Sequence, residues 1–322
     1  MRLTKEAVAA LLFAFSGIAP PLSAAWPDKP VRIIVPFAPG GTADILARTI
    51  SSKLNPVLGQ PVVVENRPGA AGNIGTDLVA KSKPDGYTLL VNLMNPHVVN
   101  QALYKSMPFN GVEDFTPIAM LAAVISTMAI HPSVPAKNVK EFIAVARARP
   151  GQIAYASAGT GSSTHLNAAV FEKMAGIRML HVPYKGGAPA VLDTMTGQTQ
   201  MIITAATQTL PHAKTGRLRL LGVTRAKRTA MLPDVPAIAE TLPGYEAVVW
   251  FGAFGPAGLP KDMTVRLNTE INKLMSAPDT KSVMENMGVE VITTTPEAFH
   301  KKLREEAGYW ANVVRKYGIK AE

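Results

Sequence analysis

A strand that ends in a glycine-rich turn and is followed by a helix occurs twice in this chain, and this repetition constrains the fold more than any other feature. The first copy begins at Val31 and reaches the turn at 36–44, and the second begins at Ile153 and reaches the turn at 157–165. After each copy, short β-branched runs alternate with helical stretches, which is typical of parallel strands joined by crossover helices. The sequence therefore predicts two similar α/β lobes, each a mostly parallel sheet flanked by helices.

The expected elements follow from hydrophobic periodicity and from the turn residues that interrupt it. In the first half we expect alternating strands and helices at 31–35, 43–54, 61–65, 73–82 and 87–92. In the second half the same alternation is expected at 153–157, 163–175, 179–182, 188–196, 201–204, 208–215 and 218–223. The tail is expected to form amphipathic helices at 265–275, 281–287 and 296–316, the last capped from within 293–295.

Two apolar stretches are expected to connect the lobes. Residues 115–130 tolerate β-structure and contain few turn residues, and residues 247–254 offer a matching return after a proline-punctuated connector. Two crossings make one lobe discontinuous. We therefore expect lobe one at 26–125 and 248–322 and lobe two at 126–247.

The first 25 residues predict export. Arg2 and Lys5 precede an apolar stretch at 7–19, and Ser23-Ala24-Ala25 forms a small-x-small triplet. This pattern is typical of a secretory signal peptide, here with cleavage after Ala25. The apolar stretch is shorter than the roughly 20 residues that a spanning helix needs. The chain contains no cysteine, so its stability is expected to come from ordinary cores.

The formal net charge of +10 raises the question of nucleic-acid binding. The basic residues are scattered along the chain, and no aromatic residues interleave with them to form a stacking platform. We therefore interpret the charge as solvated surface with a mild attraction for anions, and we expect no nucleic-acid partner.

The two glycine turns are candidates for anion binding. Glycine allows backbone N–H groups to face a ligand, and the first turn of a helix leaves N–H donors unpaired. Either turn alone is also ordinary loop chemistry. Because both occur at equivalent points of two similar halves, where the carboxyl ends of strands usually form ligand sites, we expect them to share one cleft. A second turn in each half, at 66–75 and at 183–188, is expected to converge there too.

Two side chains in these turns have open roles at this stage. Asp44 supports the dipole of the first helix, fixes its turn, or accepts a hydrogen bond from a ligand. His165 donates to a carboxylate or bonds to backbone within its own lobe. His97, which follows a strand end, is a weaker candidate for the cleft.

Motifs for catalysis are missing from the sequence. There is no G-x-S-x-G or H-E-x-x-H pattern, and neither glycine turn continues as a P-loop or as G-x-G-x-x-G. We expect no metal, no cofactor and no enzymatic activity. The competing class is an exported hydrolase that would use Ser162 or Ser163 with His165, although these side chains are more easily explained as caps and anion donors.

Several motifs resemble the substrate-binding proteins of tripartite tricarboxylate transporters, the Bug family. They are Pro36-Phe37-Ala38-Pro39-Gly40-Gly41-Thr42-Ala43-Asp44, Asn66-Arg67-Pro68-Gly69-Ala70-Ala71-Gly72-Asn73-Ile74-Gly75, Lys83-Pro84-Asp85-Gly86-Tyr87-Thr88-Leu89, His181-Val182-Pro183-Tyr184-Lys185-Gly186-Gly187 and Leu232-Pro233-Asp234-Val235-Pro236. The resemblance implies a two-lobed, type II-like periplasmic binding protein fold. It also implies a monomer that closes on a small carboxylate and delivers it to integral-membrane permease subunits; presentation of the ligand to a sensor protein is the alternative.

The resemblance also implies which residues hold the ligand. The carried-over set comprises Phe37, Gly40, Gly41 and Asp44 in lobe one and Ala158, Gly159, Thr160, Ser162 and His165 in lobe two, with Asn73 and Tyr184 from the second turns. Two positions depart from the family pattern. Thr204-Ala205 stands where an aspartate and a bulkier residue are common, and the turn at 92–95, with Asn95 at its end, replaces a serine- or threonine-rich one. Both departures are expected to line the part of the cleft that selects a di- or tricarboxylate, an acidic amino acid or an aromatic acid.

Overall fold

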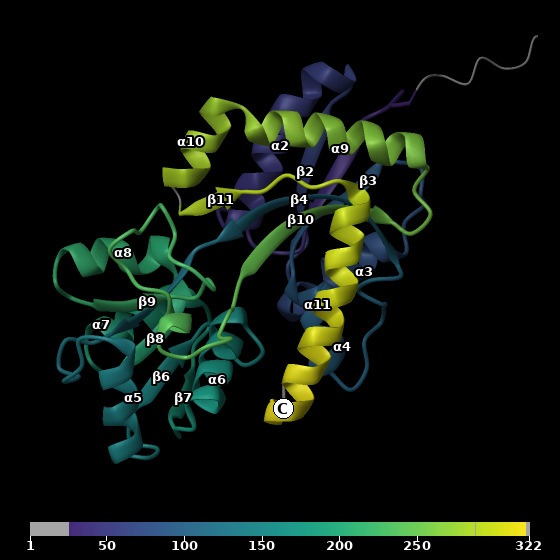
Figure 1. Cartoon of the computed structure of the whole chain (residues 1–322). Helices are drawn as coiled ribbons and strands as arrows, with labels where there is room; N and C mark the ends of the chain where they lie inside the picture. The colour runs from purple at the N-terminus through teal and green to yellow at the C-terminus, as the bar shows by residue number, and fades with distance from the viewer. Residues whose placement is uncertain (1–25, 287, 320–322) are drawn as a thin grey trace, which may run out of the picture.

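The computed structural model describes residues 26–286 and 288–319. The predicted signal peptide and its cleavage site lie outside this part of the chain. Within the described residues the chain forms two sheets, each flanked by helices, that make two lobes lying side by side (Figure 1). No helix in this part of the chain is long and apolar enough to cross a bilayer.

The sheet of lobe one carries the first glycine turn. Its strands are β1 (Val31–Val35), β2 (Val62–Asn66), β3 (Thr88–Leu93), β4 (Phe115–Val124), β10 (Val249–Pro256) and β11 (Val289–Val291), in the spatial order β11-β4-β10-β3-β1-β2. Among these strands, β1 to β4 run in one direction, and β10 and β11 run against them. The carboxyl ends of β1, β2 and β3 therefore lie together at one edge, as the repeated strand-turn-helix pattern predicts.

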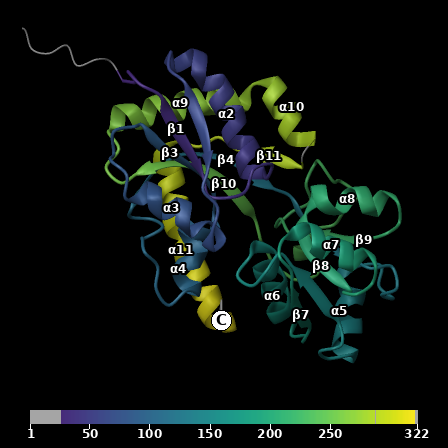
Figure 2. The same cartoon turned by 180° about the vertical axis from the view of Figure 1, so that it is seen from behind.

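Helices cover both faces of this sheet because its strands are apolar on both sides. Helices α2 (Thr42–Leu58), α9 (Lys261–Ser276) and α10 (Pro278–Asn286) pack on the face that contains Ile33. The face that contains Ile34 is covered by α3 (Asn73–Ala80), the π-helical turn η2 (Asn95–Val99), α4 (Asn100–Leu103) and α11 (Pro296–Tyr317). Figure 1 shows α11 in front of the sheet, and Figure 2, which is the view from the opposite side, shows α2 in front of it.

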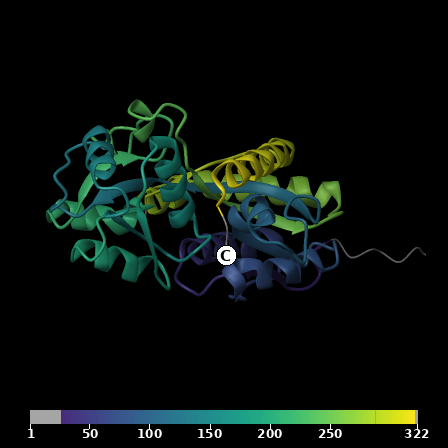
Figure 3. The same cartoon turned by 90° about the horizontal axis from the view of Figure 1, so that it is seen from below.

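Lobe two repeats the arrangement. Its strands β5 (Ser126–Ile130), β6 (Ala154–Ser157), β7 (Leu180–Pro183), β8 (Met201–Ala205) and β9 (Arg219–Val223) have the order β7-β6-β8-β5-β9, and in this described sheet only β5 runs against the rest. Helices α5 (Val139–Ala148) and α6 (Ser163–Ala175) cover one face, and α7 (Gly187–Met195) and α8 (Ala206–Lys214) lie on the other. Figure 3 shows the two lobes from below.

Both expected crossings are strands. β4 continues through Ile125 into β5, and the return passes from Ala247, whose N–H donates to Thr224 O at 2.9 Å, into β10. One buried apolar cluster extends through these crossings from Met120 in lobe one to Met128 in lobe two. The lobe limits at 125/126 and 247/248 stay a prediction, since this shared core has no gap at either point.

Most predicted helices and strands are confirmed, with ends that shift by a few residues. The predicted cap at 293–295 is Thr295, whose Oγ1 accepts from Ala298 N–H at 3.2 Å. The elements that were missed include α5, β11, the short helix η3 (Ile238–Glu240), and the helical segment η2–α4, near which a turn was expected. The sequence signal for α5 was Asn138 followed three residues later by Glu141. Asn138 Oδ1 accepts from Glu141 N–H, and Asn138 Nδ2 donates to Glu141 Oε1. β11 has too few residues to show a period.

Gly252 in β10 tests the packing of lobe one. A Cβ at this position would lie 2.4 Å from Cζ of Phe299, a side chain that is itself fully buried and unable to yield. We expect Gly252→Ala to destabilise the protein by about 1–3 kcal/mol through overpacking. Gly308→Ala is the matched control, because Gly308 is exposed in α11 with nothing within 4 Å of its Cβ position, and it should be neutral or stabilising. Chemical denaturation measures both changes, and equal effects of the two substitutions would contradict this account.

Candidate functional site

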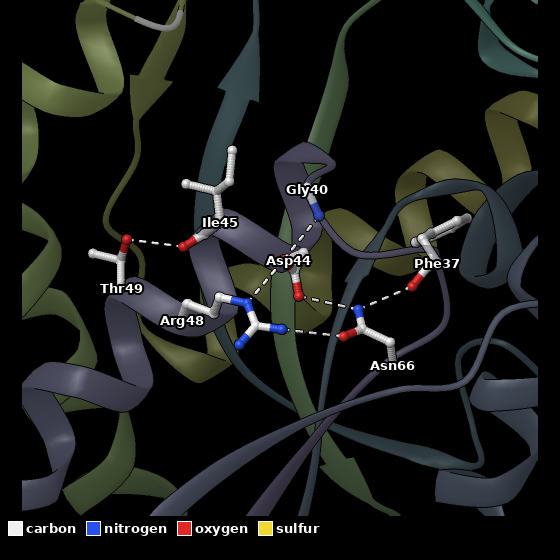
Figure 4. A network of polar contacts seen from close by, with 7 residues as sticks. All are labelled: Phe37, Gly40, Asp44, Ile45, Arg48, Thr49 and Asn66. Carbon is white, nitrogen blue, oxygen red and sulfur yellow. Dashed lines mark hydrogen bonds and ion pairs between the residues drawn. The ribbon is translucent and has the colours of Figure 1, made fainter.

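The turn after β1 is held by the carboxylate of Asp44. Asp44 Oδ2 accepts from Gly40 N–H and from Arg48 Nε, both at 2.9 Å, and Oδ1 accepts from Asn66 Nδ2 at 3.0 Å (Figure 4). Asn66 Nδ2 also donates to Phe37 O at 3.0 Å, so the amide at the end of β2 connects both ends of the turn. Of the three roles that the sequence leaves open for Asp44, the contacts support fixing the turn.

The surroundings of Asp44 keep it ionised. The hydrogen bond from Arg48 is the main cause that lowers its pKa below the usual value of 3.8, and the Gly40 N–H and the Asn66 amide add to it, while burial opposes them. Arg48 and Asn66 were missed at the sequence level. The signal for Asn66 was its place at the carboxyl end of the strand next to β1.

The second turn of lobe one packs against the first. Gly72 has a φ of +92°, and a Cβ there would lie 2.8 Å from Cζ of Phe37 and 3.5 Å from Cγ of Pro96. Phe37 therefore lies over Gly72, next to the start of η2. Asn73, which follows, is buried, and its Oδ1 accepts from Asn100 Nδ2 at 2.8 Å. Gly40 and Gly41 are exposed, so their backbone faces solvent.

The turn after β6 is held by hydroxyl groups. Ser162 caps α6, with its Oγ accepting from His165 N–H at 3.3 Å and donating to Gly159 O at 2.6 Å. Thr164 Oγ1 accepts from Ala158 N–H at 2.7 Å. Ala158, Gly159 and Thr160 are half-buried at the tip of this turn. The two glycine turns are thus shaped in different ways, one by a carboxylate and the other by hydroxyls.

His165 bonds to backbone within its own lobe. Its Nδ1 accepts from Gly161 N–H at 3.1 Å, and its ring stacks on His181 with centroids 4.2 Å apart. His181 in turn stacks on Tyr155 and lies 2.7 Å from Ser157 Oγ through Nε2. Burial, with a smaller repulsion from His181, lowers the pKa of His165 to about 4. His165 is therefore neutral at physiological pH.

These bonds argue against the hydrolase alternative. A serine nucleophile would need His165 as its base, but Nδ1 of His165 already accepts a backbone N–H, and Ser162 Oγ is directed at Gly159 O.

No group of three His, Asp or Glu side chains in residues 26–286 and 288–319 could hold a metal ion.

One side chain bridges the two lobes at the glycine turns. Asn95, the first residue of η2, donates from Nδ2 to Gly161 O in the lobe-two turn at 3.4 Å. Leu103 and Tyr104 of lobe one also approach Gly161, with atoms 3.8 and 3.9 Å from its Cβ position. Asn95 therefore lies next to the lobe-two turn, and its contact with a ligand stays a prediction.

Asn92, the first residue of the 92–95 turn, lies in the interior of lobe one. Asn92 is fully buried, donates to Thr76 Oγ1 at 3.0 Å, and has its Oδ1 bonded to Leu93 N–H at 2.8 Å. Its Nδ2 also lies 3.2 Å from Nε2 of His97, whose Nδ1 faces Gly111 O at 2.8 Å. The expectation that Asn92 lines the cleft is wrong, because all of its polar atoms are used inside the lobe. Burial lowers the pKa of His97 to about 4.

Tyr184 and Thr204 have partners within lobe two. Tyr184 Oη donates to Asp193 Oδ2 at 2.8 Å, and desolvation, followed by this carboxylate, raises the pKa of Tyr184 to about 12. Thr204 Oγ1 donates to Gln208 Oε1 at 2.8 Å, and that amide lies against Gly187 at the start of α7. Contact of either side chain with a ligand stays a prediction.

The main open cavities lie away from the glycine turns. One of about 560 Å³ is lined by charged side chains from both lobes, among them Arg225, Arg228, Lys281 and Glu285, and the Arg225–Glu290 ion pair joins the lobes there. It contains no residue of either glycine turn. We place the candidate site at the turns because backbone donors and the interlobe contact of Asn95 meet there, whereas the cations of this cavity are largely matched by carboxylates.

Comparison with known proteins adds independent information. The model of the tripartite tricarboxylate transporter family receptor matches residues 46–319. Protein BugT of Bordetella pertussis is 37% identical over 317 residues, which cover 98% of this chain and 97% of BugT. The structure is similar to that of R. palustris Rpa4515 with adipate, with a TM-score of 0.82 and 34% identity over 92% of this chain and 99% of that one. It is also similar to MatC from Rhodopseudomonas palustris with bound malate, with a TM-score of 0.78 and 28% identity over 90% of this chain and all of that one.

Asp44→Asn tests the lobe-one turn. The substitution keeps the shape but removes the charge that binds Arg48, so we expect a loss of about 1–2 kcal/mol at pH 7. Because the folded pKa of Asp44 is lowered, its contribution is present above about pH 4 and disappears as the carboxylate protonates in stronger acid. Thermal melts of both proteins at pH 7 and pH 3 should show a smaller difference at the lower pH. A difference that is independent of pH would contradict the ionic role.

His165→Asn tests the buried histidine. The folded pKa of His165 is about 4 and the reference value is 6.5, so between these values the unfolded state binds the extra proton and stability falls as pH falls. Asparagine can still accept from Gly161 N–H but does not titrate. We expect the variant to lose less stability than the wild type between pH 7 and pH 4, as measured by denaturation at each pH. NMR titration of the His165 ring should show it neutral at pH 5.5, and protonation near pH 6.5 would refute the assignment.

Proposed function

The chain belongs to the family of tripartite tricarboxylate transporter receptors, and we propose that it captures a small carboxylate in the periplasm and delivers it to the membrane subunits of such a transporter. The family consists of solute-binding receptors, so the protein is a binding protein and not an enzyme. The proposed ligand position lies between the turns at 36–44 and 157–165.

The observation that carries this proposal is that each lobe has a glycine turn at the carboxyl end of a strand, after β1 in lobe one and after β6 in lobe two. Each turn starts a helix that is capped or fixed from within, α2 through Asp44 and α6 through Ser162. Such helix starts attract anions through their unpaired backbone N–H groups and the positive end of the helix dipole. The contact from Asn95 to Gly161 supports the view that both turns act on one ligand.

The relatives support a carboxylate as the ligand. Rpa4515 was solved with adipate and MatC with malate, and both structures share this fold over at least nine-tenths of the chain. In our proposal one turn captures a carboxylate while the lobes are apart, and rotation about the β4–β5 and β10 crossings brings the other turn over it. Ligand binding offsets the free-energy cost of closing, and the closed form is what the membrane subunits recognise.

A thermal-shift panel tests this function. Dicarboxylates, tricarboxylates, acidic amino acids and aromatic acids should include at least one member that raises the melting temperature, because a ligand at 100 times its Kd adds about 2.7 kcal/mol. Small-angle scattering should show compaction with the same ligand. If no acid shifts the melting temperature and none compacts the protein, capture of a carboxylate is refuted.

A matched pair of glycine variants locates the ligand on the lobe-two turn. Gly159 and Gly176 both have positive φ values, +121° and +60°, so alanine strains the backbone at either position. Gly159 lies at the tip of the turn and Gly176 at the far end of α6. Gly159→Ala should abolish the ligand-induced shift and Gly176→Ala should keep it. If both variants keep the ligand-induced shift in melting temperature, the ligand does not bind at this turn.

A further inference from the structure

Asn95 has a buried carbonyl oxygen without a partner in the described part of the chain. The residue is 6% exposed, and its Oδ1 has no hydrogen-bond partner there, whereas its Nδ2 donates to Gly161 O. The orientation of this amide follows from chemistry, because the carbonyl of Gly161 can accept only from the NH2 group. A buried acceptor that stays unpaired costs free energy, so such an atom calls for an explanation.

Neighbouring amides show that the fold can satisfy such groups. Asn73 Oδ1 accepts from Asn100 Nδ2 at 2.8 Å, and Asn92 Oδ1 accepts from Leu93 N–H at 2.8 Å. These residues are also buried, Asn73 at 9% and Asn92 at 0% exposure, and lie in the same lobe. The unpaired oxygen of Asn95 is therefore an exception among these three amides, and it occurs at the side chain that reaches the other lobe.

The position of Asn95 places this oxygen beside the proposed ligand site. Asn95 follows the carboxyl end of β3, and the next residue, Pro96, approaches Gly72, over which Phe37 of the first turn lies. On its other side Asn95 contacts Gly161 of the lobe-two turn. Asn95 thus contacts the lobe-two turn directly, and its neighbour Pro96 approaches the same glycine as Phe37 of the lobe-one turn.

The chemistry of an amide oxygen restricts what can pair with it. A carboxylate is ionised at neutral pH and only accepts hydrogen bonds, so it cannot pair with Asn95 Oδ1. A donor on the ligand is needed, either a hydroxyl or an ammonium group. Asp44 is the only carboxylate in the sequence of the two turns at 36–44 and 157–165, and both of its oxygens already bond to Gly40, Asn66 and Arg48. An ammonium group would find no free counter-charge there, which favours a neutral hydroxyl.

We propose that Asn95 is a specificity-determining residue that selects a hydroxycarboxylate over the same acid without the hydroxyl. The hydroxyl donates to Asn95 Oδ1 while the backbone donors of the turns bind the carboxylate. Nδ2 remains on Gly161 O, so recognition of the hydroxyl and contact between the lobes depend on one amide. This inference rests on the proposed binding of a carboxylate.

Matched pairs of acids test it by calorimetry. Malate and succinate differ only in one hydroxyl, as do 2-hydroxyadipate and adipate, and aspartate replaces the hydroxyl of malate with an ammonium group. We expect the wild type to bind the hydroxy acid of at least one pair roughly tenfold more tightly than its partner, as expected for one well-placed hydrogen bond. Equal affinities within every pair that binds, or tighter binding of aspartate than of malate, would overturn the proposal.

A substitution assigns the preference to Asn95. Asn95→Leu has a similar size and neither donates nor accepts. It removes the contact with Gly161 for both acids alike, so both can bind more weakly, but the affinity ratio of the hydroxy acid to the acid without the hydroxyl should fall to about one. A preference that persists in the variant would assign the selectivity to another residue and refute the role of Asn95. Melting temperatures without ligand check that the variant folds; if it does not, the wild-type comparison decides. Absence of binding by every acid, hydroxylated or not, would refute the proposed function itself and this inference with it.

Discussion

The buried segment in which β4 passes through Ile125 into β5 sets how the two lobes face each other. Because β4 leads directly into β5 and the two strands belong to different sheets, the carboxyl ends of β1 and β3 in lobe one face those of β6 and β8 in lobe two. The apolar core that continues from Met120 to Met128 makes this connection costly to disrupt. The return at β10 adds a second connection between the lobes.

The two glycine turns are held in shape by different side chains, each from within its own lobe. In lobe one a single ionised carboxylate bonds to Gly40, Arg48 and Asn66, and a buried charge is tolerated because it is paired in this way. In lobe two, hydrogen bonds hold the turn in place. They come from the hydroxyls of Ser162 and Thr164 and from the neutral ring of His165. Both arrangements fix the backbone in advance, which lowers the entropy lost on binding an anion.

In the sequence, the buried histidines and asparagines look like ligand-binding residues, but in the structure most of them hold the protein together. His97 and Asn92 complete each other's hydrogen bonds inside lobe one, and His165 stacks on His181 while it holds Gly161. Asn95 differs from them because one of its polar atoms reaches the other lobe and the other is left unpaired. A polar side chain near a cleft is therefore informative only when its partners are known.

The two α/β halves and the crossing strands near 115–130 and 247–254 could be predicted from the sequence, because hydrophobic period and turn chemistry are local properties. The glycine turns and Asp44, Ser162 and Asn95 were also singled out, and their contact with a ligand stays a prediction. The sequence did not show η2, β11, or the partnership of Asp44 with Arg48 and Asn66. Only the tertiary structure decided which polar atoms are already satisfied, since residues as far apart in sequence as Asn95 and Gly161 become partners when the strands align. A hydrogen bond depends on the distance and the angle between donor and acceptor, and neither can be predicted from the spacing of residues along the chain.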